Sequence, residues 1–298
     1  MTKKNTSHLL AAICGAALLA GPVSAEDIIK PASNAAHVTA DDEAPVLEVF
    51  ARLSELAHLA PLMQVVATEG ARHGIGLEGA LFPGRGGDSW ANAVGRIQSP
   101  DRLVDMLEAT LRTELSRDDA SAVSDFYAGD VGRRLAAREV SARHAMLDAK
   151  VESDAISAST ALTDERTPRA VLIGELIDTL DLVTANVTGG LNANFAFYQG
   201  LGDGGALRKR LTEREMLAMV WSQEGEVRER TRKWLTGYLT LAYAPLTDTD
   251  LRAYIDFSKT PAARRYNAAM FSGFGKVFEQ TSYDLGRAAA TFMIQKDT

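Results

Sequence analysis

Apolar residues recur every three to four positions along most of the chain after residue 45, the spacing that places them on one face of an α-helix. In the first half the pattern runs through residues 45–70, where Pro61 predicts a kink or a split. It returns over residues 170–187, with apolar positions aligned at an offset of 124, and again over residues 131–158 and 262–294. Because no stretch shows the sustained alternation typical of strands, the sequence predicts an all-α fold.

The chain contains an internal repeat. Residues 115–137 recur as residues 246–268 without a gap, at an offset of 131 (246 − 115), and eight of the 23 aligned positions are identical. We therefore predict two duplicated helical halves. Helical repeat 1 covers residues 45–160, helical repeat 2 covers residues 168–298, and a linker at residues 161–167 joins them.

Each copy of the repeat predicts a capped helical hairpin. Ser116 and Thr247 precede a helix, and Asp119 and Asp250 stand three residues further on, the spacing of a capping box. A break follows in both copies, and in the second copy Pro261 stands where a helix accepts proline in its first turn. A second helix then returns along the first.

Adjacent arginines fall in the first turn of the second helix of each hairpin, where the helix dipole disfavours cations. One interpretation is that a carboxylate of the preceding helix reaches across the hairpin and compensates them. The alternative is that the guanidinium groups and helix N–H groups bind a small anionic ligand. The arginines are Arg133, Arg134, Arg264 and Arg265, and the candidate carboxylates are Asp125 and Asp256.

Trp90 and Trp221 lie 131 residues apart, in register with the repeat. Large aromatic residues on amphipathic helices normally pack in the core, so a structural role is one interpretation. The alternative is that the two indole rings form the aromatic wall of a ligand groove. Both tryptophans are therefore candidate binding residues, together with the arginine pairs.

The repeat resembles an exported bacterial family catalogued as domain of unknown function 2059. The shared pattern is Leu-Ser/Thr-x-x-Asp-x-x-Ala-x-x-x-Phe-Tyr, a break, and then Gly-Arg. The first copy keeps Phe126 and Tyr127, whereas the second keeps Phe257 and Pro261 but has Ser258 in place of the tyrosine. The resemblance implies a small, helical, exported protein, and it supplies no catalytic residues.

The N-terminus has the pattern of a signal peptide. Two lysines precede an apolar run over residues 9–20, and small residues before Glu26 predict cleavage after Ala25. Residues 1–25 are thus the predicted signal peptide, residues 26–44 a flexible leader, and the periplasm the predicted location. Removal of residues 1–25 takes away two lysines and the one cysteine, so the net charge becomes −9 (30 − 39).

These properties exclude several classes of function. A chain without cysteine has no thiol catalysis and no cysteine-ligated metal, and an acidic chain is a poor partner for nucleic acid. Nothing after the signal is apolar enough to span a membrane. Residues 74–79 and 200–205 match G-x-G-x-x-G, but each follows a helix, so we interpret them as loops and not as a dinucleotide site. The histidines lack metal-ligand spacing, and we expect no metal and no cofactor.

We expect a binding or protein-interaction module of the bacterial envelope, whose partner is an unknown protein or a small anionic ligand, rather than an enzyme. One alternative is a helical periplasmic enzyme, such as a hydrolase, with a cleft between the repeats. That alternative would gain support from a histidine and a carboxylate that meet in a buried pocket. A second alternative is an envelope assembly or stress factor that presents an exposed apolar patch.

Overall fold

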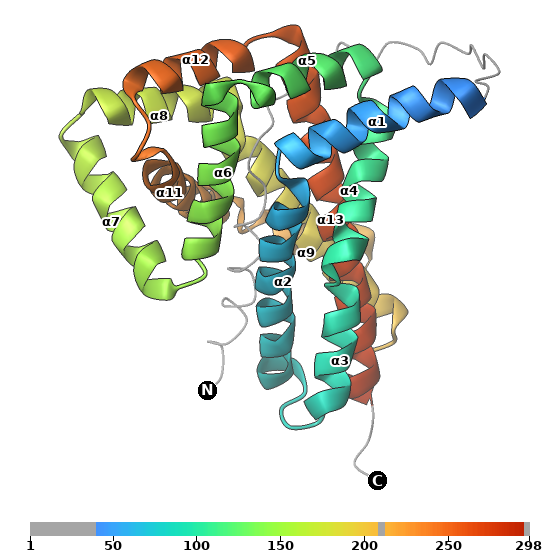
Figure 1. Ribbon diagram of the computed structural model, residues 1–298. Helices are drawn as coiled ribbons and strands as arrows, with labels where there is room; N and C mark the ends of the chain where they lie inside the picture. Colours follow the sequence, from blue (N-terminus) through green and yellow to red (C-terminus); the bar gives the residue numbers. More distant parts are fainter. Residues whose placement is uncertain (1–39, 208–211, 295–298) are drawn as a thin grey trace.

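The fold is described from a computed structural model, which covers residues 40–207 and 212–294 (Figure 1). Within these ranges every regular element is a helix, so the predicted all-α class is confirmed. The predicted signal peptide and most of the predicted leader lie outside them. The helices are α1 (Ala40–Leu56), α2 (Leu59–Leu81), α3 (Gly87–Ile97), α4 (Pro100–Glu114), α5 (Arg117–Ala128), α6 (Asp130–Ala145), α7 (Ala149–Asp164), α8 (Pro168–Thr179), α9 (Leu182–Asp203), α10 (Glu213–Trp221), α11 (Glu224–Tyr243), α12 (Asp248–Ser258) and α13 (Pro261–Ile294).

The two hairpins begin at equivalent positions. The start of α12 follows that of α5 by 131 residues (248 − 117), and the start of α13 follows that of α6 by the same offset (261 − 130). The hairpins also exchange partners: α13 of the second half packs on α4 of the first, and α6 of the first half packs on α11 of the second. Such reciprocal packing is what a duplication predicts, and the duplication itself stays a prediction.

A residue with a left-handed backbone conformation divides the first predicted helix of each half. His58, with φ 54°, separates α1 from α2, and Asp181, with φ 43°, separates α8 from α9. The predicted split near Pro61 is confirmed, and the proline lies in the first turn of α2, where no intrahelical N–H bond is lost. These junctions are 123 residues apart (181 − 58), one residue fewer than the offset of 124 at which the apolar positions of the two halves align.

Three expectations about helix bounds are wrong. The predicted helix over residues 131–158 is two helices, because Asp148 caps a new one by accepting bonds from the backbone N–H groups of Lys150 and Val151 at 2.7 and 3.3 Å. Helix α7 continues to Asp164, inside the predicted linker, and α1 begins at Ala40, inside the predicted leader. The start signal at Asp148 lies within an apolar pattern that continues on both sides, so the pattern alone does not reveal the break.

The glycine-rich segments expected as loops are largely helical, since residues 74–79 lie in α2 and residues 200–203 end α9, whereas Gly204 and Gly205 follow that helix. Gly200 of this segment and Gly286 of α13 have a packing role. A Cβ on Gly200 would lie 2.2 Å from the Tyr283 carbonyl oxygen, and one on Gly286 would lie 2.2 Å from the Phe197 carbonyl oxygen. Glycine therefore lets the backbones of α9 and α13 approach more closely than any side chain would allow.

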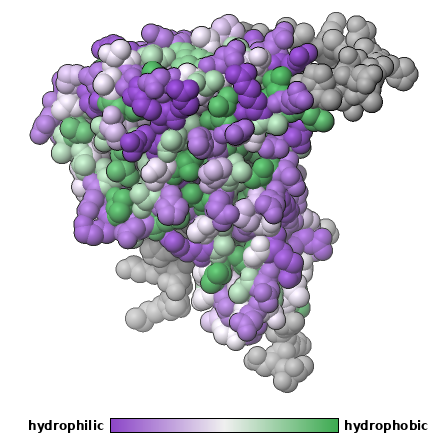
Figure 2. All heavy atoms as spheres, viewed as in Figure 1, coloured by the Kyte–Doolittle hydropathy of each residue, from purple (hydrophilic) through white to green (hydrophobic). Residues whose placement is uncertain are grey.

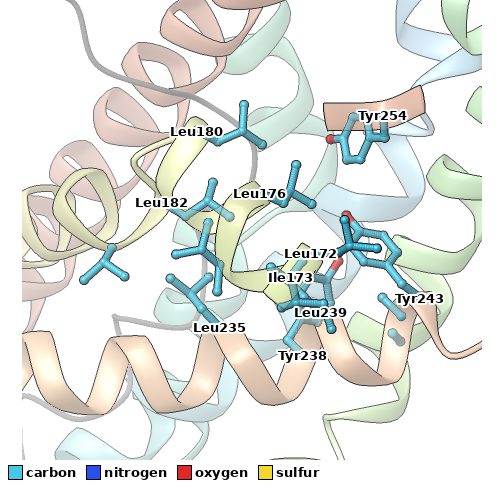
Figure 3. Packing of buried hydrophobic residues seen from close by; sticks show 14 of the residues in the cluster. Leu172, Ile173, Leu176, Leu180, Leu182, Leu235, Tyr238, Leu239, Tyr243 and Tyr254 are labelled. Carbon is cyan, nitrogen blue, oxygen red and sulfur yellow. The ribbon is translucent and has the colours of Figure 1, made fainter. Parts of the chain in front are cut away.

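The buried apolar residues form three clusters, and the largest surrounds α8 and α11. Figure 3 shows its centre, where Leu172 and Leu176 of α8 face Leu239 and Tyr243 of α11, with Tyr254 of α12 nearby. The second cluster joins α1, α2, α4 and α5 to α13, and the third lies around Trp90. Figure 2 shows hydrophilic and hydrophobic residues intermixed on the outer surface. No described helix is long and apolar enough to cross a membrane.

Candidate functional site

The second arginine of each pair is held by the cap carboxylate of the other half. Arg134 donates from Nη1 and Nη2 to Asp250 at 2.9 Å, and Arg265 donates from Nε and Nη2 to Asp119 at 2.7 and 2.6 Å. Both carboxylates also belong to helix caps, and their side chains are only one-tenth exposed. These hydrogen bonds lower the pKa of Asp119 and Asp250. Two equivalent bidentate ion pairs therefore link the two halves.

The first arginine of each pair, Arg133 and Arg264, is exposed. Arg133 donates to the Ala128 carbonyl oxygen. Asp125 bonds Arg52 at 3.1 Å, so its expected reach to the arginine pair is wrong, and Asp256 is exposed. Asp130, in the first turn of α6, compensates part of the first pair, since it bonds Arg134 at 3.0 Å and lies 3.9 Å from Arg133. The bidentate partners come from the facing hairpin, because the two hairpins exchange partners, and the sequence of a single hairpin does not reveal this.

The two register-matched tryptophans have different surroundings. Trp90 is buried in α3, donates from Nε1 to the Gly74 carbonyl oxygen at 2.9 Å, and meets Phe82 and Phe292 edge-on. Trp221 ends α10 and is 47% exposed. Trp90 therefore belongs to the core, and the structure does not bring the tryptophans together as an equivalent pair.

The aromatic residues of the repeat meet where the hairpins cross. The rings of Phe126 and Phe257 stack at 3.7 Å, and Tyr127 meets Phe257 edge-on at 6.5 Å. Tyr127 is buried, and Pro261 opens α13 as predicted. These residues, like Asp119 and Asp250, have structural roles.

Sequence reasoning missed a pocket between the two halves. Its walls come from α2 and α6 of the first half and from α11 and α13 of the second. The void measures about 430 Å³ together with adjoining open solvent, and the space in it that water-sized groups can occupy measures about 20 Å³, enough for a small polar group. Its polar residues are Glu139, Arg143, Tyr238 and Tyr266, and its apolar residues include Leu59, Leu62, Met270 and Phe274.

Glu139 is the buried carboxyl group of this pocket. Its Oε1 accepts a hydrogen bond from the Tyr243 hydroxyl at 2.6 Å, and its backbone carbonyl accepts one from Tyr238 at 3.0 Å. Burial raises the pKa of Glu139 to about 7, although the Tyr243 bond acts in the opposite direction. The carboxyl group therefore exchanges its proton near neutral pH.

Arg143 is the one cation among the pocket-lining residues, and it is already engaged. It is 1% exposed, it donates to both carboxylate oxygens of Glu69 at 2.9 and 2.5 Å, and its guanidinium lies 4.7 Å from the ring centre of Trp234. Burial also raises the pKa of Glu152, which interacts with Trp234. The guanidinium of Arg143 is thus taken up by Glu69 and by the ring of Trp234.

Tyr266 is 1% exposed and lines the pocket. Its hydroxyl is buried without a hydrogen-bond partner of acceptable geometry among the described residues, although the Tyr127 hydroxyl is close enough to affect its pKa. Burial, and then the charge of Glu139, raise the pKa of Tyr266. An unpaired buried hydroxyl costs free energy, which marks this part of the pocket as suited to a polar partner.

The charged residues of the pocket have apolar counterparts in the second copy. At the offset of 131, Glu139 corresponds to Met270 and Arg143 to Phe274, and all four line the same pocket. An apolar pair therefore fills the corresponding positions on α13, so burial at these positions does not by itself require charge. Extension of the repeat alignment beyond residue 137 would have exposed this difference.

No family model, curated protein or solved structure matches the chain. The resemblance stated above therefore rests on its motif residues alone. In the part of the chain that the structure describes, no group of three or more histidine, cysteine, aspartate or glutamate side chains is placed to hold a metal ion.

Proposed function

We propose that the protein is an exported α-helical binding module of the bacterial envelope and that the pocket between its halves is the ligand site. The observation that carries this proposal is the unpaired hydroxyl of Tyr266 in the same pocket as the buried carboxyl of Glu139, where most of the other lining residues are apolar. A ligand with a polar head and an apolar body satisfies both parts of such a site. The signal-like residues 1–25, with cleavage after Ala25, support export to the periplasm.

The pocket replaces the arginine pairs as the favoured site. Arg134 and Arg265 already bind carboxylates in a bidentate manner, so most of their donors are not free for an anionic ligand. A histidine and a carboxylate in one buried pocket would have supported the enzyme alternative, and the lining residues of this pocket include Glu139 but no histidine. The exposed large apolar residues come from five different helices rather than from one face of a helix; they are Leu47, Ile75, Val171, Trp221 and Ile294.

Native mass spectrometry of the mature protein, purified gently from the periplasm, tests the proposal. We expect an added mass that disappears on denaturation in the wild type and falls in the Glu139→Gln and Tyr266→Phe variants. Arg264→Ala is the matched control, because Arg264 is exposed and lies outside the pocket.

Two results would overturn the proposed function. One is an added mass equally abundant in the wild type, both pocket variants and the control. The other is a bare protein that, in ligand-observed NMR, binds no member of a small-molecule library covering amines, alcohols, carboxylates and amides.

A further inference from the structure

We propose that the pocket binds a small primary amine, whose ammonium head reaches Glu139 and Tyr266 while its apolar part lies against Leu62, Met270 and Phe274. This inference rests on the proposed function and names the chemical class of its ligand. It depends on three properties of the site: its charge, its free hydrogen-bonding groups and the size of the space inside it.

The charge of the site favours a cation. The guanidinium of Arg143 bonds Glu69 and lies over the ring of Trp234, so no side chain neutralises Glu139 when it is ionised. A buried carboxylate without a cationic partner is strongly unfavourable, and a bound ammonium group removes that penalty. A carboxylate ligand would add like charge in the same low-dielectric space.

The free polar groups match the donors of an ammonium head. Among the described residues, the hydrogen bond from Tyr243 to Oε1 is the only one that the Glu139 carboxyl accepts, so Oε2 is open to another donor. The Tyr266 hydroxyl offers a second acceptor oxygen. A primary ammonium group carries three N–H donors, of which these two oxygens take two, and the mouth of the pocket leaves the third for water.

The size of the pocket limits the head group. The space of about 20 Å³ that water-sized groups can occupy favours a compact head such as an ammonium group. The ring of Phe274 and the side chains of Leu62 and Met270 supply an apolar wall for a short alkyl chain.

Isothermal titration of the mature protein with n-butylamine, n-butanol and n-butyrate at about pH 8 tests the inference, since Glu139 is then mostly ionised. We expect butylamine to bind most tightly. Glu139→Gln is expected to weaken the binding of butylamine by about thirtyfold or more, because it removes the charge partner. The same substitution is expected to change the affinity for butanol by less than about threefold. Tyr266→Phe is expected to weaken the binding of both butylamine and butanol, and Arg264→Ala is expected to change neither affinity.

The other outcomes separate the two proposals. Butanol or butyrate that binds more tightly than butylamine, with loss in Tyr266→Phe, would overturn the amine class and leave the ligand site standing. Butylamine binding that survives Glu139→Gln unchanged would likewise overturn the inference. Absence of binding by all three probes would overturn the amine class, and the library screen described above would then decide the fate of the ligand site.

Discussion

The rings of Phe126 and Phe257 stack face to face, with centroids 3.7 Å apart and planes inclined by 2°. The two phenylalanines occupy the same position of the repeated hairpin, 131 residues apart. Each ring therefore packs on its own counterpart where the halves cross. The crossed ion pairs Arg134–Asp250 and Arg265–Asp119 flank the same hairpins, so both features depend on one geometry.

We expect Phe126→Ala and Phe257→Ala each to lower the free energy of unfolding by about 2–3 kcal/mol, less than for a fully buried ring because both are half-buried. The double variant should lose about 0.5–1.5 kcal/mol less than the sum, since both substitutions remove the same stacking contact. Urea unfolding measures this coupling. Phe126→Ala combined with Phe278→Ala, whose ring stacks on Phe274 instead, is the control and should be additive.

We expect the crossed ion pairs to give an unequal response to substitution of their two partners. Asp119→Ala and Asp250→Ala remove the ion pair and the hydrogen bond that each carboxylate accepts from the N-cap residue, although the N-cap side chain still accepts from the backbone N–H. Each substitution should cost about 2 kcal/mol. Arg265→Ala removes only the ion pair, and Arg134→Ala also removes a bond to the exposed Asp130. Each should cost about 1 kcal/mol or less. Equal losses for aspartate and arginine variants in chemical denaturation would contradict this assignment, and Arg264→Ala should change stability by less than about 0.5 kcal/mol.

We expect Glu139 to make stability depend on pH. Its pKa rises from 4.5 in the unfolded chain to about 7 in the folded one, so between these values the folded state keeps a proton that the unfolded state releases. Stability should therefore fall as pH rises from about 4.5 to about 7, by roughly 3 kcal/mol at most, and then level off.

Glu139→Gln isolates this effect. The amide keeps an acceptor for Tyr243 but does not titrate, while Glu152, whose pKa is also raised, titrates in both proteins and cancels in their difference. The variant should gain stability relative to the wild type as pH rises through this range, in urea unfolding at several pH values. A difference that stays constant with pH would show that the pKa of Glu139 is the same in the folded and the unfolded chain.

Much of the local structure follows from the sequence. The caps at Ser116 and Thr247, the break before Pro261 and the long closing helix α13 were all predictable, because each depends on residues within a few positions of one another. The break at Asp148 carried the same kind of signal, but continuous apolar periodicity on both sides concealed it.

The site was not predictable in the same way. Glu139 and Arg143 lie on a helix whose sequence pattern is compatible with a solvated face, and only the exchange of hairpins between the halves buries them against α11. The partners that define the pocket, Tyr238 and Tyr266, are about 100 residues or more away in the chain. Non-local packing decides such a site, and no local propensity encodes it.

We expect two glycines of α13 to respond to alanine in opposite directions. A Cβ at Gly286 would lie 2.2 Å from the backbone oxygen of Phe197, so Gly286→Ala must separate α9 from α13 and should cost about 1–3 kcal/mol. A Cβ at Gly275 meets no atom within 4 Å, so Gly275→Ala should stabilise the helix by about 0.5–1 kcal/mol. Thermal and urea unfolding of the two variants measure the contrast. A neutral Gly286→Ala would mean that the helices separate freely, and the close approach of α9 and α13 would then have no role in stability.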